Sequence, residues 1–268
     1  MVKLKSWGAL AVVALVLVAC ATSPTGRKQF MLFSPSDTEM GKMGAVAFED
    51  LKKKQKVSGD AKTNAYVACV SNALLATLPG DEGRGWEVKV FDDDTPNAFA
   101  LPGKKIGVHT GILKVAKTPD QLAAVVGHEI GHVEARHSGE RMSINTAATT
   151  GAVLGAILVG GSSNDRDMAL AALGVGATVG VILPFSRTQE SEADTIGLKY
   201  MAQAGFDPNQ SVTLWQNMAA ENKGKPPEFL STHPSDSTRM AALKRQIPSV
   251  MPEYQAAQAR GLKPNCKR

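Results

Sequence analysis

Two histidines four residues apart, separated by a glutamate, constrain this chain more than any other feature. The motif is His128-Glu129-Ile130-Gly131-His132, in a stretch from Leu122 to Val133 whose apolar residues recur with helical spacing. Histidines at this spacing lie one turn apart on the same face of a helix, so both imidazoles can reach one ion. The sequence therefore predicts a helix with two metal ligands, His128 and His132, and with Glu129 beside the first.

The cofactor that this motif predicts is Zn²⁺, one ion per chain. Zinc binds imidazole nitrogen at about 2.0–2.1 Å and keeps a water molecule in its fourth position at catalytic sites. Glu129 is placed to take a proton from that water and to return it to a leaving amine. Gly131 leaves room for a neighbouring segment to approach the helix closely. The chain has only five histidines, which makes a chance match rare.

Zinc needs a third protein ligand, and two patterns could supply it. In one, a histidine follows ten residues after the first ligand; that position is Ser138, so this pattern fails. In the other, a glutamate on a later helix completes the site. Glu190 and Asp194 are four apart and share a helical face, whereas Glu192 points away. We expect Glu190 to be the ligand, Asp194 to accept a hydrogen bond from a ligand imidazole, and Glu192 to lie on a solvated face.

Residues 1–19 are typical of a bacterial lipoprotein signal peptide. Lys3 and Lys5 precede an apolar run, residues 9–18, that is too short to span a bilayer comfortably. Leu17-Val18-Ala19-Cys20 resembles a lipobox, in which the cysteine becomes the lipidated first residue; an ordinary signal peptide is the alternative. The residue after the cysteine is Ala21, whereas lipoproteins retained in the inner membrane usually have an aspartate at that position. We therefore expect a lipid anchor in the outer membrane, on the periplasmic side.

The export signal also bears on the other two cysteines, Cys69 and Cys266. An exported chain lies in an oxidising compartment, where an even pair of cysteines favours a disulfide. We expect a bridge that ties the C-terminal tail to a helix near the front of the domain. Two free thiols are the alternative.

Taken together, the histidine motif and the later acidic motif resemble those of a known family. His-Glu-Ile-Gly-His-Val at 128–133 and Ser-Arg-x-x-Glu-x-Glu-Ala-Asp at 186–194 are similar to the zinc metallopeptidase family of the CAAX prenyl protease and HtpX, nearest to its LoiP-type periplasmic lipoproteins. The resemblance extends from Asp37 to Ile247. It implies a zincin-like (gluzincin) fold, zinc bound by His128, His132 and Glu190, and hydrolysis of misfolded or unassembled envelope proteins.

Two further segments match the family near its site. Asn97-Ala98-Phe99-Ala100 corresponds to the strand beside the active site, whose edge can bind an extended peptide; an interior strand is the alternative. His233 is expected to donate a hydrogen bond to the reaction's oxyanion or to cap the zinc, unless it is a plain turn histidine. Arg239 is a candidate structural ion-pair partner, and His109 is expected to be structural.

The remaining pattern predicts a mainly helical α+β protein with a small sheet. Residues 20–35 predict a tether, and residues 36–268 a single metallopeptidase domain. Residues 147–183 are apolar and predict a helical hairpin that is buried, lies at a membrane interface or crosses the membrane. Helices are expected at 36–56, 61–78, 118–137, 187–204, from 207 and at 237–246, and strands at 86–90, 97–101 and 106–109.

Composition limits the classes of partner. With 268 residues, of which 43% are apolar, the chain can bury one sizeable core. Its net charge of +5 is dispersed and aromatic residues make up 5%, which argues against nucleic-acid binding. We expect the partners to be protein or peptide substrates, among them outer-membrane proteins or their assembly machinery. The chain should also contact the membrane through its lipid anchor. An assembly or chaperone-like binding factor with a latent zinc site is the alternative function, although such a factor would not need Glu129.

Overall fold

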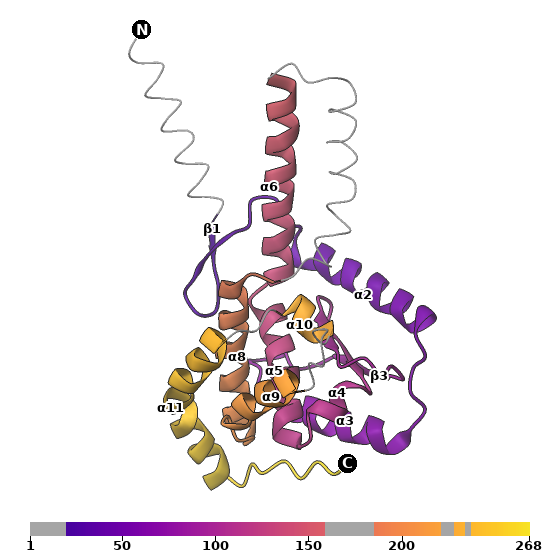
Figure 1. Ribbon diagram of the computed structural model, residues 1–268, viewed down its shortest axis with the longest axis vertical. Coiled ribbons are helices and arrows are strands. Elements are labelled where there is room, and N and C mark those ends of the chain that lie inside the picture. Colours follow the sequence, from indigo (N-terminus) through magenta and orange to yellow (C-terminus); the bar gives the residue numbers. More distant parts are fainter. Residues whose placement is uncertain (1–19, 159–184, 221–227, 234–236) are drawn as a thin grey trace. The chain divides into compact units, whose positions relative to one another are not determined.

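The computed structural model describes residues 20–158, 185–220, 228–233 and 237–268 (Figure 1). The chain divides into two compact units, residues 1–36 with 136–183 and residues 37–135 with 184–268. The predicted signal peptide lies outside the described residues, as does most of the predicted hairpin at 147–183.

The second unit is mainly helical with a small mixed sheet, which confirms the predicted α+β class. Strand β5 (Lys105–His109) is the middle of three, with β3 (Glu87–Phe91) parallel to it and β4 (Ala98–Leu101) antiparallel. Among the described residues β4 is therefore an edge strand. The helices are α2 (Asp37–Lys54), α3 (Ala61–Leu75), α4 (Ile112–Val115), α5 (Pro119–Glu134), α8 (Arg187–Ala204), α9 (Gln210–Ala220), α10 (Glu228–Thr232) and α11 (Ser237–Ala259).

Local signals set the ends of the two helices that matter most. The Thr118 side chain accepts a hydrogen bond from the backbone N–H of Gln121, and Pro119 follows it, so α5 begins there. Ser186 and Gln189 form a reciprocal capping box at the start of α8. Gly205 ends α8 with φ 85°, a left-handed conformation that glycine adopts without strain.

The predicted end of α11 is wrong. The sequence analysis gives Gln246 as the end of this helix, but α11 continues through Pro248 and Pro252 to Ala259. A proline removes one helical hydrogen bond. Here the burial of Ile247 and Ala257, together with the packing of α11 on α8, offsets that loss.

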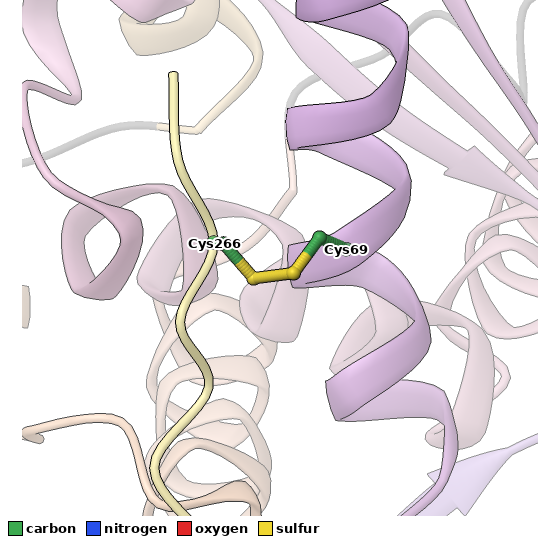
Figure 2. Close-up of a disulfide and its surroundings, with 2 residues drawn as sticks. All are labelled: Cys69 and Cys266. Carbon is green, nitrogen blue, oxygen red and sulfur yellow. A yellow bond between two sulfur atoms is a disulfide. The ribbon is translucent and has the colours of Figure 1, made fainter.

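Helix α5 runs through the apolar core of the second unit. Leu122, Val126 and Ile130 on this helix are fully buried. A disulfide joins Cys69 on α3 to Cys266 in the C-terminal tail, with 5.6 Å between the Cα atoms (Figure 2). The two cysteines are 197 residues apart, and closing so long a loop lowers the entropy of the unfolded chain.

The described residues of the first unit form a short hairpin and one helix. Strand β1 (Cys20–Thr22) pairs antiparallel with β2 (Lys28–Phe30), and the helix is α6 (His137–Leu158). Residues 20–35, which the sequence predicts to be a tether, thus contain a hairpin. The Arg27 guanidinium donates to both carboxylate oxygens of Glu140, each at 2.7 Å. Within the described residues, none of the helices has the length and apolarity that a membrane crossing requires.

Glu87, the first residue of β3, gives the fold a testable dependence on pH. Its carboxylate accepts hydrogen bonds from Lys105 and Lys52, each at 2.8 Å, and these bonds lower the pKa of Glu87 from 4.5 to about 2. A lowered pKa in the folded state stabilises the fold above pH 4.5, and this stabilisation is lost as the pH falls towards 2.

We expect Glu87→Gln to reduce the free energy of unfolding by about 1 kcal/mol at neutral pH, since a partly exposed ion pair is worth little more. The difference from wild type should shrink as the pH approaches 2, and urea unfolding across this range would measure it. Glu82→Gln is the control. The Glu82 carboxylate lies 3.9 Å from Lys104 Nζ, so the same substitution there removes a much weaker ion pair. A loss that is the same at every pH would contradict the assignment.

Candidate metal centre

The site forms where α5 and α8 approach each other without intervening side chains. Gly127 on α5 faces Gly197 on α8, and a Cβ atom on Gly131 would lie 2.7 Å from the carbonyl oxygen of Ala193. No real Cβ atom comes that close, so only glycine permits this separation. The backbone of α8 therefore lies near enough for Glu190 to reach the two histidines of α5.

Four buried side chains place possible ligand atoms within 4.8 Å of one another: His128, His132, Glu190 and His233. The Nε2 atoms of His128 and His132 are 3.0 Å apart, and Glu190 Oε1 lies 3.3 Å from His132 Nε2. His233 Nδ1 lies 3.2 Å from His128 Nε2 and 3.1 Å from Glu190 Oε1. Four ligands at zinc distance from one ion form a tetrahedron with edges of about 3.3 Å. The spacing of these atoms thus fits a single ion of that size.

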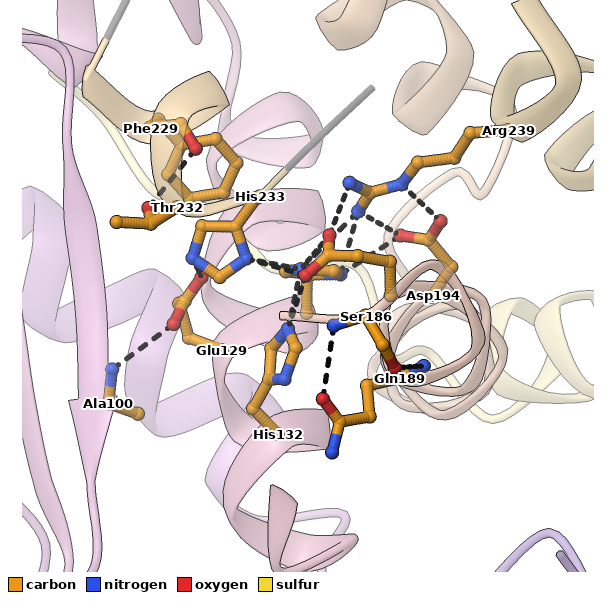
Figure 3. A network of polar contacts seen from close by, with 12 residues as sticks. Ala100, Glu129, His132, Ser186, Gln189, Asp194, Phe229, Thr232, His233 and Arg239 are labelled. Carbon is orange, nitrogen blue, oxygen red and sulfur yellow. Dashed lines mark hydrogen bonds and ion pairs between the residues drawn. The ribbon is translucent and has the colours of Figure 1, made fainter. Parts of the chain in front are cut away.

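Glu129 lies beside this group and is 3% exposed. Its Oε2 accepts a hydrogen bond from the backbone N–H of Ala100 at 3.3 Å, and its Oε1 lies 3.4 Å from His233 Nε2 (Figure 3). Oε1 has no hydrogen-bond partner among the described residues. Burial raises the pKa of Glu129, and this effect exceeds the opposing attraction of the nearby imidazoles. The carboxylate thus has one hydrogen-bonded oxygen and one oxygen that lies beside the His233 imidazole without a hydrogen bond.

A second layer of charge holds the ligands in place. Asp194 Oδ1 lies 2.9 Å from His128 Nδ1, the hydrogen-bonding position expected for it. The Arg239 guanidinium donates to both oxygens of Asp194, at 2.7 and 2.8 Å, and to Glu190. On its other side the guanidinium lies 3.9 Å from the centre of the Trp215 ring. With Nδ1 donating to Asp194, His128 turns its Nε2 lone pair towards the ligand group.

The buried charges decide which groups carry protons when no cation is bound. Burial raises the pKa of Asp194, but its ion pair with Arg239 outweighs this and leaves the pKa below the ordinary value. Burial and Arg239 lower the pKa of His128, yet Glu190 and Asp194 outweigh them and raise it to about 9. Burial lowers the pKa of His132. Both imidazoles must be neutral to ligate a metal, so we expect cation binding to release a proton.

Three outcomes differ from the sequence analysis or extend it. Glu192 is predicted to be solvated, and this is wrong: it is 5% exposed. Arg239, a candidate ion-pair partner, joins Asp194 to Glu190. His109 lies outside the ligand group, buried edge-on against Phe91 and Phe99.

Aromatic side chains that the sequence does not predict surround the histidines of the ligand group. The rings of Phe185 and His132 have centroids 3.7 Å apart, and Phe229 stacks on His233 at 4.4 Å. Phe185 directly precedes the Ser186 cap, and Phe229 lies four residues before His233. These two spacings are the only local signals, and neither identifies a site residue by itself.

Comparison with known proteins identifies the family. The sequence model of peptidase family M48 matches residues 53–247, which include His128, His132, Glu190 and His233. The chain belongs to peptidase family M48. This confirms the resemblance to the metallopeptidase family on which the sequence analysis relies.

Relatives of this M48 chain come from mitochondria and from bacteria. It is 43% identical over 190 residues to the mitochondrial metalloendopeptidase OMA1 of Schizosaccharomyces pombe, covering 70% of this chain and 54% of that one. It is 28% identical over 222 residues to the putative beta-barrel assembly-enhancing protease of Vibrio cholerae, covering 78% and 46% respectively. The chain thus spans about half the length of these relatives.

The approach of α5 to α8 can be tested through metal affinity. We expect Gly131→Ala to weaken zinc binding about tenfold or more, because the new methyl group must push the α8 backbone, and Glu190 with it, away from the histidines. Competition with a chelator measures the affinity. Gly59→Ala is the control, since a Cβ there meets no atom within 4 Å. Unchanged affinity in Gly131→Ala would show that helix separation does not position Glu190.

Proposed function

We propose that this chain is a zinc-dependent endopeptidase. The observation that carries the proposal is the convergence of His128, His132 and Glu190 at spacings that suit one zinc ion, with the free oxygen of Glu129 beside them. These three residues would hold the ion. When bound, zinc supplies a Lewis acid and a water molecule whose pKa is lowered to about 7.

The residues of the chain would divide the remaining work. Glu129 Oε1, free of hydrogen bonds, takes a proton and later delivers it to the leaving amine. The bond from Ala100 N–H to Oε2 fixes the carboxylate in place while the proton moves. Asp194 and Arg239 keep His128 and Glu190 oriented, so the ligand geometry is formed before substrate arrives.

The edge of β4 supports an extended peptide as substrate. The backbone N–H of His109 donates to the carbonyl of Asn97 at 3.0 Å, so Asn97, Phe99 and Leu101 bond towards β5. The backbone groups of Ala98 and Ala100 then point to the open edge. Ala100 N–H reaches Glu129 there, which places this edge beside the proposed proton carrier. We infer that substrate pairs with residues 97–100 as an added strand.

Recognition through the backbone favours a particular class of substrate. Main-chain pairing requires a segment that is extended and not already in a sheet or helix, which folded proteins rarely expose. Misfolded or unassembled envelope proteins meet this requirement. The lipobox at Cys20 supports an outer-membrane anchor facing the periplasm, and the beta-barrel assembly-enhancing proteases among the relatives support outer-membrane proteins or their assembly machinery as partners.

The endopeptidase proposal predicts the effect of one isosteric change. Glu129→Gln should reduce cleavage of casein by about 10²–10⁴-fold, because the amide cannot accept the proton, while the zinc content stays at one ion per chain. Glu134→Gln is the control, since it makes the same change on the same helix outside the ligand group. Wild-type turnover by Glu129→Gln would remove this residue from the mechanism.

A second candidate is an assembly or chaperone-like binding factor with a latent zinc site. The position of His233 favours it, because Nδ1 in the ligand group would be a fourth protein ligand and leave no position for water.

If His233 caps the zinc in this way, we expect His233→Ala to raise casein cleavage at unchanged zinc content. If His233 instead donates to the oxyanion, the same variant lowers turnover about 10²-fold. A binding factor without peptidase activity predicts no cleavage by either protein.

A further inference from the structure

The first unit exposes large apolar side chains at one place. Leu32 is 41% exposed, Phe33 is 43% and Ile144 is 47%. The backbone N–H of Phe33 donates to the Ser143 hydroxyl at 2.9 Å, which brings the segment after β2 against α6 next to Ile144. We call Leu32, Phe33 and Ile144 the apolar patch. Adjacent exposed apolar side chains of this size mark interaction sites more often than isolated ones do.

Helix α6 extends the apolar patch with an exposed face that carries no charged residue. Ile144, Ala148 and Gly151 are exposed at spacings of four and three residues, so they lie on one face of the helix. No charged residue occurs between Met142 and Leu158. The exposed face of a helix in water normally carries charged side chains. The composition of this helix face is therefore typical of a surface that contacts an environment less polar than water.

The hairpin places the chain's proposed lipid attachment point close to this patch. Cys20 is the first residue of β1 and pairs with Phe30, the last residue of β2. Leu32 and Phe33 follow Phe30 by two and three residues, and the rings of Phe30 and Phe33 have centroids 6.3 Å apart. A lipid on Cys20 thus leaves the chain at the end of the hairpin from which the patch continues.

Charge in the first unit favours an anionic surface. Among its described residues, Lys28 and Arg136 are exposed basic side chains, whereas Arg141 is buried and Arg27 is paired with the buried carboxylate of Glu140. Exposed charge on the described part of this unit is therefore positive. A positive surface with apolar side chains is attracted to anionic headgroups and gains further from apolar insertion.

We propose that the apolar patch docks on the anionic lipid surface that holds the anchor, with Leu32, Phe33 and Ile144 inserted at the level of the headgroups. The inference rests on the lipid-anchored part of the proposed function. A patch of three side chains is a weak membrane ligand by itself, but the anchor makes its contact intramolecular and raises its effective concentration. The docked patch fixes the orientation of the first unit on the membrane, which an anchor alone does not.

Spin labels test the proposal in the intact lipoprotein. Cys69 and Cys266 are bridged and Cys20 carries the lipid, so a cysteine introduced by Phe33→Cys or Ile144→Cys is the only free thiol. Thr25→Cys is the control, in the exposed turn at the other end of the hairpin. Each protein is labelled and reconstituted in phosphatidylglycerol–phosphatidylethanolamine vesicles. Electron paramagnetic resonance then compares access of oxygen, which enters lipid, with access of a nickel chelate, which stays in water.

We expect oxygen access to exceed chelate access at positions 33 and 144, and the reverse at position 25. The contrast should weaken in phosphatidylcholine vesicles, which lack the anionic headgroups. Chelate access at 33 and 144 equal to that at 25 would overturn the proposal. Dipolar broadening between labels would also overturn it, because a second copy would then cover the patch.

The mass of the purified chain separates this proposal from the peptidase assignment. Acyl chains on Cys20 are required for docking as proposed, and an unmodified Cys20 would overturn it. Casein cleavage depends on Glu129 in the second unit and is measured independently, so either proposal can fail while the other stands.

Discussion

The contact between the backbones of α5 and α8 underlies everything that the site can do. Each helix has a glycine where the other comes closest, Gly127 against Gly197, and Gly131 lies against the carbonyl of Ala193. Both candidate histidine ligands come from α5, so a third ligand would have to come from a neighbour within the reach of one glutamate side chain. Side chains between the helices would widen the gap, and Glu190 would then fall short of the imidazoles. Absence of side chains at these positions is thus as necessary to the ligand geometry as the ligands themselves.

Arg239 solves the electrostatic problem that this close packing creates. Glu190 and Asp194 lie one turn apart on α8, both buried, and two uncompensated carboxylates there would repel and become protonated. The guanidinium contacts both and lies against Trp215, so it neutralises one unit of charge without admitting water. Removal of one member of such a buried network costs about 3–5 kcal/mol, because the remaining charges lose their partner. With Arg239 in place, the site holds one net negative charge from these three residues, which favours a divalent cation.

The sequence predicts some parts of this molecule well, and the reasons for its failures are physical. Helix α8 is predicted at its observed bounds because its cap and its terminal glycine lie in the sequence next to the helix. The length of α11 is underestimated because tertiary packing outweighs two prolines. Glu192 is misplaced because helical spacing gives the direction of a side chain relative to Glu190 but does not show what covers that direction. The ring on His132 belongs to Phe185, far along the chain, so no local pattern predicts that contact. The ring on His233 belongs to Phe229, only four residues away, but that spacing alone does not identify a site residue.

The disulfide has a consequence for the order in which the molecule matures. The loop closed by Cys69 and Cys266 contains every residue of the ligand group, as well as Glu129, Asp194 and Arg239. Until the bridge forms, the unfolded chain keeps the entropy of a loop of 197 residues, and the folded arrangement is correspondingly less favoured. Reducing conditions therefore disfavour the folded arrangement of the ligand group, and oxidising conditions favour it. Covalent closure thus couples assembly of the candidate metal centre to the redox state of its surroundings.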